Sequence, residues 1–309
     1  MQQILSRLKP YSRWLILGGT LFFLLKAFQD NWHEVAAIRI EPLGWAKIAI
    51  ALGVTLLAHI WSGWIWTWIL AELNQSVLSS RFIQVYLKTN IAKYLPGNVW
   101  HYYGRISAAK NAGVTANVAT LSVLLEPLLM AASALIVVLV SLQIAINTHS
   151  NLQGLLIFIL ATVLLAIHPR FLNLVIRFFS RLKLKSTPAN QVNVKNFVVK
   201  RYLWRPLFGE LCFIGLRGIG FLLTILALTS VELNQIPLLI GAFSLAWLLG
   251  LVIPGAPGGL GVFEVTAIAL LRQSFSPGLV VSAIALYRLV SILAETLGAG
   301  LAQLDEQWF

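Results

Sequence analysis

Charged residues are scarce in this chain of 309 residues, and cysteine is almost absent. Charged side chains make up 11% of the sequence, whereas a soluble globular domain carries about 25%. A water-soluble surface cannot be built from so few charges, which excludes soluble enzymes, disordered proteins and collagen-like fibres. The single cysteine, Cys212, excludes an intrachain disulfide and a metal site built from several cysteines. We expect no cofactor and no metal.

Apolar residues, by contrast, make up 58% of the chain, and the mean hydropathy is +0.81. A membrane-spanning helix needs about 20 mostly apolar residues. The sequence therefore predicts an all-α, polytopic helical membrane protein with about seven spans, folded as a single membrane domain over residues 1–309. The predicted spans are 12–29, 45–71, 117–146, 152–168, 206–230, 236–253 and 277–302.

Lys and Arg number 23 against 11 Asp and Glu, which gives a net charge of +12. In so apolar a chain, membrane orientation and contact with anionic lipid explain this excess better than a nucleic acid, and no nucleic-acid partner is expected. Cations are frequent at the N-terminus, in 72–115 and in the basic loop 168–205, and rare in 30–44, 147–151 and 231–235. The positive-inside rule then predicts a cell (inner) membrane protein with a cytoplasmic N-terminus and an external C-terminus.

Two stretches do not fit a plain helix bundle. Residues 80–113 are too polar to span, and they break at Pro96 and Gly97. Residues 254–276 open with a run that cannot continue a helix, made of Pro254, Gly255, Pro257, Gly258, Gly259 and Gly261. We predict re-entrant half-helices with these prolines and glycines as hinges, because broken backbone at membrane depth is buried in protein or lines a wet cavity. The alternative is a surface loop with an interfacial helix.

The two breaks also resemble each other. Leu95-Pro96-Gly97 and Ile253-Pro254-Gly255 both read hydrophobic-Pro-Gly, and each precedes a short helix and a long span. This similarity favours two parallel repeats, an organisation found in some transporters.

Charges inside the predicted spans are the most informative residues, because each is costly unless it is paired or hydrated. Arg217, Arg288 and Glu126 lie about nine to eleven residues into their spans, near mid-depth. Glu295 shares a helical face with Arg288, and Glu264 closely follows the Pro/Gly run. We predict a polar cavity in which the arginines hold an anionic head group and the carboxylates balance charge or carry protons. The alternative is structural ion pairing, such as Arg217 with Glu126 or Arg288 with Glu295.

The densest polar cluster surrounds the first break and contains Lys93, Asn98, His101 and Arg105. Asn98 can cap the second half-helix, which places His101 and Arg105 one turn apart on one face. A helix N-terminus flanked by Lys93 and Arg105 attracts a phosphate. The alternative is an interfacial belt of aromatic and basic residues. His59, among several tryptophans, is expected only to pack or to anchor the interface.

Two motifs resemble the lysylphosphatidylglycerol synthase transmembrane-region family, a flippase-like domain family of multi-pass proteins. The motifs are Lys93-Tyr94-Leu95-Pro96-Gly97 with Arg105, and Pro254-Gly255-Ala256-Pro257-Gly258-Gly259-Leu260-Gly261-Val262-Phe263-Glu264. In the best-known members this domain moves an aminoacylated phospholipid between leaflets, and a separate soluble domain makes that lipid. The resemblance implies a stand-alone member that translocates without synthesis.

We therefore expect a translocator of an anionic phospholipid or lipid-linked head group. One alternative is a membrane scaffold or accessory subunit for a lipid or envelope enzyme. Another is a membrane-embedded lipid-modifying enzyme that uses His101 with Glu126 or Glu264 as acid and base. No catalytic residue is assigned, because the sequence contains no HExxH, P-loop or GxSxG motif. The sequence does not determine the oligomeric state, and it is compatible with a homodimer.

Overall fold

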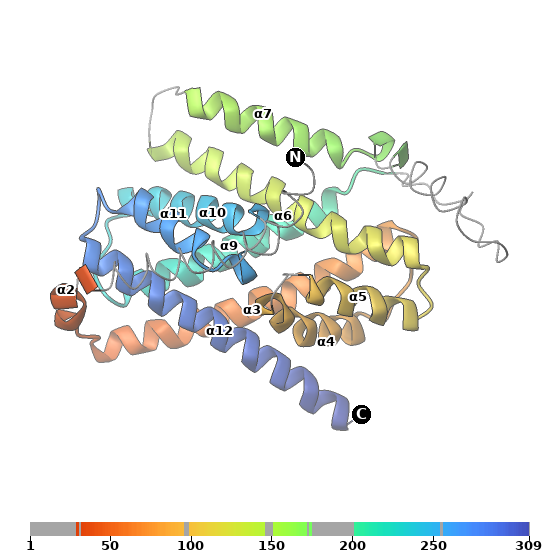
Figure 1. The fold of residues 1–309 in the computed structure, drawn as a ribbon, viewed down its shortest axis with the longest axis horizontal. Coiled ribbons are helices and arrows are strands. Elements are labelled where there is room, and N and C mark those ends of the chain that lie inside the picture. Colours follow the sequence, from red (N-terminus) through yellow and green to blue (C-terminus); the bar gives the residue numbers. More distant parts are fainter. Residues whose placement is uncertain are drawn as a thin grey trace, which may run out of the picture.

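The computed structural model describes residues 29–30, 32–95, 99–145, 151–171, 173–174, 201–253 and 256–308. Every regular element within these ranges is a helix (Figure 1), which confirms the prediction of an all-α, polytopic membrane protein. Among the residues that the structure describes, five helices are long and apolar enough to cross a membrane. They are α3 (Pro42–Glu72), α6 (Ala116–Ala145), α9 (Trp204–Leu226), α10 (Ile236–Val252) and α12 (Pro277–Trp308).

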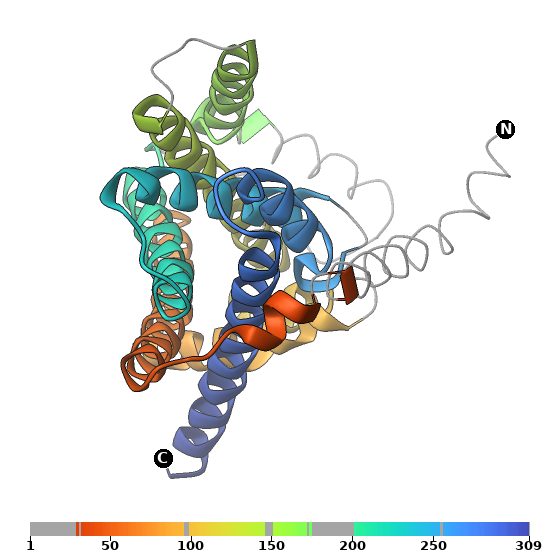
Figure 2. The same ribbon diagram turned by 90° about the vertical axis from the view of Figure 1, so that its left-hand side faces the viewer.

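The remaining predicted spans are shorter or lie outside the description. The span expected at 152–168 is α7 (Asn151–Ala166), a 16-residue apolar helix that packs on α6 at the edge of the bundle (Figure 2). The first predicted span, 12–29, lies outside the described residues apart from its last residue, as does most of the basic loop 168–205. A short helix, α2 (Trp32–Ala37), leads into α3 and contacts α12.

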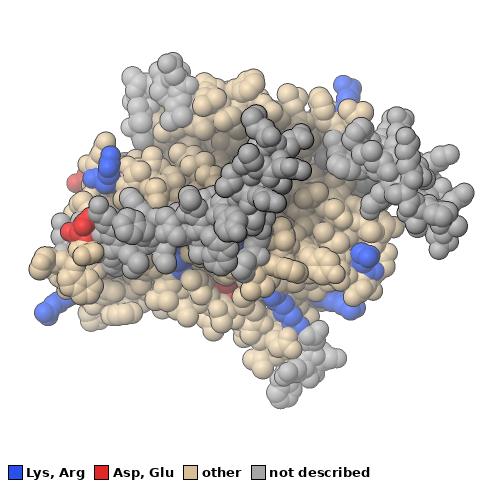
Figure 3. All heavy atoms as spheres, viewed as in Figure 1, with Lys and Arg blue, Asp and Glu red and all other residues tan. Residues whose placement is uncertain are grey.

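The outer surface fits a lipid environment. In the space-filling view of Figure 3, most of the visible face carries neither acidic nor basic side chains. Large apolar side chains such as Phe158 on α7 and Phe208 on α9 are exposed, at 70% and 63%. Because lipid tails solvate such side chains and water does not, this surface is suited to the hydrocarbon core of a bilayer.

The first broken element forms a helical hairpin. It consists of α4 (Ser79–Asn90) with η1 (Ile91–Tyr94), followed by α5 (Trp100–Asn111), which returns beside α4. The Ser79 hydroxyl lies 3.4 Å from that of Thr67, and the Asn90 amide lies 3.4 Å from the His59 ring. This hairpin therefore runs from the end of α3 to its middle and back. Its predicted hinge and cap, at 96–98, lie outside the described residues.

The second broken element also forms a hairpin, and α10 is its inward arm. η4 (Pro257–Gly259) turns the chain, and α11 (Val262–Leu271) packs back against α10. Ile225 at the end of α9, shortly before α10 begins, and Leu271 at the end of α11 line one small apolar pocket, so the two arms begin and end at the same level. Although α10 is long enough to cross, the chain returns to the side from which it entered. The predicted hinges Pro254 and Gly255 lie outside the described residues.

Glycine is required at this second turn. Gly258, Gly259 and Gly261 have φ angles of 60°, 71° and 85°, in the left-handed region. A Cβ atom on Gly259 would also lie 3.2 Å from the Cα atom of Gly250, so η4 and α10 approach each other backbone to backbone.

We predict that Gly259→Ala lowers the free energy of unfolding by about 1–3 kcal/mol, because it adds left-handed strain and a backbone contact. Gly53→Ala is the matched control, since a Cβ on this α3 residue would meet nothing within 4 Å. Thermal unfolding of both variants in detergent provides the measurement. An unchanged Tm for Gly259→Ala would show that the turn does not need glycine.

The two halves of the chain share one plan with inverted direction. Each half contains a long helix, a hairpin and a second long helix, which are α3 to α6 in the first half and α9 to α12 in the second. When each helix is replaced by its counterpart in the other half, the principal helix contacts are reproduced. Lys47 near the start of α3 donates to the Leu226 carbonyl at the end of α9, whereas Arg205 at the start of α9 covers Trp68 near the end of α3. The expectation of parallel repeats is therefore wrong, because the Pro-Gly tripeptides mark the hairpin tips but carry no information on direction.

The same arrangement corrects the predicted side of the C-terminus. Asp305 at the end of α12 is hydrogen-bonded to Gln84 in α4, so α12 ends on the side of the α3–α4 connection. The C-terminus and the cation-rich stretch 72–115 thus share one side, whereas the sequence puts them on opposite sides. The difference arises because hydropathy counts 236–253 as a complete crossing. In the structure, α10 and α11 form a hairpin that returns to the side on which α10 begins.

Single-cysteine labelling checks this topology. In a Cys212→Ser background, we predict that Ser76→Cys and Gln303→Cys react with a membrane-impermeant maleimide from the same face of the membrane. Leu233→Cys, which replaces a side chain that is 84% exposed at the start of α10, should react from the other face. Labelling of Gln303→Cys together with Leu233→Cys would contradict the re-entrant path of α10 and α11.

Candidate functional site

The tips of the two hairpins meet at the middle of the bundle and enclose a cavity of about 110 Å³. Tyr94 of η1 lies directly against Gly258 of η4, where a Cβ atom would come within 2.6 Å of the tyrosine ring. Long helices close the other sides, with Arg217 from α9 and with Arg288 and Glu295 from α12. Residues from both halves of the chain therefore line one polar cavity.

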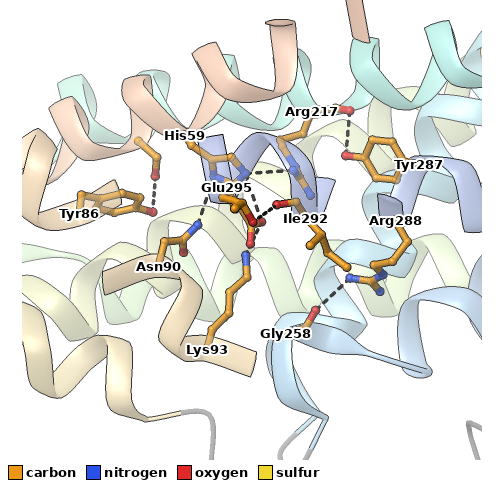
Figure 4. A network of polar contacts seen from close by, with 12 residues as sticks. His59, Tyr86, Asn90, Lys93, Arg217, Gly258, Tyr287, Arg288, Ile292 and Glu295 are labelled. Atoms are coloured by element: carbon orange, nitrogen blue, oxygen red, sulfur yellow. Dashed lines mark hydrogen bonds and ion pairs between the residues drawn. The ribbon is translucent and has the colours of Figure 1, made fainter. Parts of the chain in front are cut away.

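One side of the cavity holds a buried network around Glu295 (Figure 4). The Lys93 ammonium donates to Glu295 Oε1 at 2.6 Å, and His59 Nε2 lies 3.2 Å from the same oxygen. The Asn90 amide nitrogen lies 3.4 Å from His59 Nδ1. The network joins η1, α3 and α12, and the charge of Glu295 is balanced by Lys93.

His59 Nε2 lies between two groups that compete for it, at 3.2 Å from Glu295 Oε1 and at 3.2 Å from Arg217 Nη1. A neutral imidazole that carries its proton on Nε2 donates to Glu295 and accepts at Nδ1 from the Asn90 amide. In this tautomer Nε2 does not accept from Arg217, and the guanidinium has no acceptor on this side.

Arg217 is the cation of the cavity that has no carboxylate in salt-bridge contact among the described residues. Its side chain is buried, and its Nε atom has no hydrogen-bond partner. The guanidinium lies over the Tyr287 ring at 5.3 Å, and the Tyr287 hydroxyl donates to the Arg217 backbone carbonyl at 3.2 Å. Arg217 is thus held in place by its own helix and an aromatic ring while its charge stays unneutralised.

Arg288, on the other side of the cavity, is fully engaged by the second hairpin. Its Nε donates to Glu264 Oε1 at 2.7 Å, and its Nη1 donates to the Gly258 carbonyl at 3.2 Å. The other oxygen of Glu264 accepts from the backbone N–H of Gly261 at the start of α11. This set of bonds ties the hairpin turn to α12, and it matches the charge of Arg288 within the protein.

His101 adds a polar group to the cavity wall. Its ring is buried on the same hairpin as Lys93 and Arg105, so a further positive charge on the imidazole is unfavourable. Its Nδ1 atom is buried without a hydrogen-bond partner among the described residues. His101 and Arg217 therefore present unsatisfied polar groups to the same cavity.

A second buried polar cluster lies beside the cavity, between α4, α5, α6 and α9. Arg105 Nη1 donates to Glu126 Oε2 at 2.7 Å, and the Tyr86 hydroxyl donates to Glu126 Oε1 at 2.7 Å. Tyr86 also contacts the Ser62 hydroxyl at 2.7 Å, and the Arg105 guanidinium stacks on the Tyr86 ring at 3.6 Å. Glu210 of α9 joins this cluster and is completely buried.

The predicted site residues thus divide into two groups. The cavity is lined by Lys93, His101, Arg217, Arg288 and Glu295, together with the predicted hinge glycines Gly258 and Gly259. Glu264 supports Arg288 from behind, whereas Arg105 and Glu126 belong to the second cluster. Asn98 lies outside the described residues. The ion pairs are Lys93–Glu295, Arg105–Glu126 and Arg288–Glu264, and not the two pairings suggested from the sequence.

Two important residues escape the sequence argument. His59 is the centre of the Glu295 network, although its tryptophan neighbours in the sequence indicate only packing. Glu210 lies near the start of a predicted span, where a carboxylate is easily read as interfacial. Its one sequence signal is its spacing from Arg217, seven residues and hence about two helical turns.

The acid–base pair considered for a lipid-modifying enzyme is not assembled in this conformation. Glu126 is occupied by Arg105 and Tyr86, and Glu264 is occupied by Arg288 and a backbone N–H. Each carboxylate is therefore already neutralised by a guanidinium group.

A comparison with protein families gives one match. Residues 13–298 match the family model described as the lysylphosphatidylglycerol synthase TM region. A comparison with curated proteins gives no match.

Proposed function

The chain belongs to the lysylphosphatidylglycerol synthase transmembrane-region family, and from this premise we propose that it translocates the anionic head group of a phospholipid or lipid-linked molecule across the membrane. The family connects the chain with lipid handling in a membrane. The cavity supports the finer proposal, because it lies where two opposed hairpins meet.

Arg217 is the observation that carries the proposal. Lys93 and Arg288 are each matched by a carboxylate, which leaves the cavity with the uncompensated charge of Arg217. A buried and unpaired guanidinium is unfavourable, and a phosphodiester or carboxylate that accepts two parallel hydrogen bonds relieves this penalty. The His101 ring lines the same cavity, and its Nδ1 atom has no hydrogen-bond partner among the described residues.

The size of the cavity favours a head group as the ligand. A volume of about 110 Å³ is too small for a whole lipid, so the acyl chains would remain in the bilayer while the head group passes between the hairpin tips. Inverted repeats with helix breaks at the binding site are the organisation that supports alternating access in many secondary transporters. The contact between Tyr94 and Gly258 is the place where this pathway would separate.

We further propose the orientation of the protein in the cell membrane. The two ends of the first hairpin, which carry the exposed Arg81 and Lys110, and the cation-rich loop 168–205 are cytoplasmic by the positive-inside rule, and the C-terminus lies with them. A crossing by 12–29 then puts the N-terminus in the cytoplasm as well.

Reconstitution tests the proposed function. Vesicles of phosphatidylethanolamine and phosphatidylglycerol would contain the purified protein and an acyl-chain-labelled NBD-phosphatidylglycerol, with labelled phosphatidylcholine in a parallel sample. Dithionite quenching should report faster movement of the anionic probe than in empty vesicles, and a smaller effect on the zwitterionic probe. No acceleration across several anionic and lipid-linked probes would contradict translocation, and a new mass in the extracted lipids would indicate an enzyme instead.

A further inference from the structure

Glu210 is a buried carboxyl group that the anion-binding cavity does not use. Its exposed fraction is 0%, and neither side-chain oxygen has a hydrogen-bond partner among the described residues. An ionised carboxylate in such a position would be an isolated charge in an apolar interior, which costs several kcal/mol. Burial without a partner therefore favours the neutral, protonated form of Glu210.

The surrounding charges support this protonation state. The groups that face Glu210 are Glu126 from α6, Arg105 from α5 and Tyr86 from α4. Arg105 is already paired with Glu126 at 2.7 Å, so its charge is not available to a second carboxylate. Two carboxyl groups beside one guanidinium hold one proton between them, because like charges at close range cannot both ionise in a low dielectric.

The position of Glu210 connects this proton to the cavity. Arg217 lies two turns further along the same face of α9. Arg105 lies one turn after His101 on α5, the returning arm of the first hairpin. A displacement of this hairpin would therefore move Arg105 relative to both carboxyl groups while it changes the cavity wall.

We propose that Glu210 is a proton-binding site and that exchange of its proton drives head-group movement through the cavity. In this step the O–H bond of Glu210 breaks when the hairpin opens, the proton passes to water on the open side, and the same water hydrates the new carboxylate. A proton taken up from the opposite side restores the neutral group. The inference rests on the proposed function, and it adds the energy source.

Infrared spectroscopy of the purified protein tests the proton directly, without any transport. The wild type should show the carbonyl stretch of a buried carboxylic acid at neutral pH, and Glu210→Gln should lose this band. Glu72→Gln, a carboxyl-to-amide change at the end of α3, is the matched control and should retain it. If Glu210→Gln does not fold, Glu210→Asp should shift the band. A band that is absent from the wild type, or that persists in Glu210→Gln, overturns the proposal.

Proteoliposomes with a pH gradient test the coupling. With one proton per lipid, a gradient of one pH unit should bias the leaflet distribution of NBD-phosphatidylglycerol about tenfold. Glu210→Gln should lose this bias, whereas Glu72→Gln should keep it. A wild type that moves the lipid with no response to the gradient overturns the coupling but not translocation. A wild type that shows the infrared band and moves no lipid contradicts the proposed function while the protonation of Glu210 stands.

Discussion

Arg105→Met is expected to lower the free energy of unfolding by about 3–5 kcal/mol, the largest stability effect that we predict for a single substitution. Arg105 and Glu126 are both only 2% exposed and are joined at 2.7 Å. Removing the guanidinium leaves the Glu126 carboxylate buried with the Tyr86 hydroxyl as its remaining donor. The unpaired charge, rather than the lost contact, accounts for most of the effect.

Chemical denaturation and thermal unfolding in detergent measure this prediction. The matched control is Lys110→Met, an exposed position on the same helix, which should leave the stability close to that of the wild type. The double variant Arg105→Met with Glu126→Gln should recover much of the loss, because no buried charge remains. Equal stability of Arg105→Met and Lys110→Met would mean that the pair does not hold α5 against α6.

Arg217→Gln should reduce the translocation of an anionic lipid by about 10- to 100-fold. A hydrogen bond to a charged group contributes about 1.5–3 kcal/mol, and each 1.4 kcal/mol is about tenfold in rate or affinity. The stability should not fall in parallel, since Arg217 has no carboxylate partner among the described residues and the change removes an uncompensated buried charge. A structural arginine would behave in the opposite way.

The vesicle assay and thermal unfolding are therefore measured on the same preparations. Arg205→Gln serves as the control, because this exposed arginine at the start of α9 lies over the Trp68 ring and does not reach the cavity. Normal translocation by Arg217→Gln would refute the proposed binding role. A large drop in Tm without a specific loss of anionic-lipid movement would assign Arg217 to folding.

Two ion pairs that attach the hairpins occupy equivalent positions in the two halves of the chain, with the acidic and the basic residue exchanged. Arg105 on the returning helix α5 pairs with Glu126 on the long helix α6, whereas Glu264 on the returning helix α11 pairs with Arg288 on α12. Each pair ties a hairpin to the long helix that follows it. The inverted halves therefore use the same electrostatic attachment, and Arg217 takes part in neither pair.

Composition and hydropathy alone predicted the class of protein and most of its long helices. Runs of apolar residues such as 206–230 can be satisfied only in lipid, so their length gives a helix before any tertiary contact is known. The Pro/Gly run was equally informative, because Gly258, Gly259 and Gly261 have the left-handed backbone that their residue type favours. The mid-span residues Arg217, Arg288 and Glu295 line the polar cavity between the hairpins.

Only the tertiary structure decided direction and partnership. Hydropathy does not distinguish a helix that crosses from one that turns back, so α10 appeared as a span and the C-terminus was predicted on the wrong side. The sign of a charged side chain does not specify its partner either. The ion pairs join residues that are 21 positions apart in Arg105–Glu126 and 202 positions apart in Lys93–Glu295. His59 and Glu210 acquire their surroundings from helices that are distant in sequence, and these contacts form only when the inverted halves pack together.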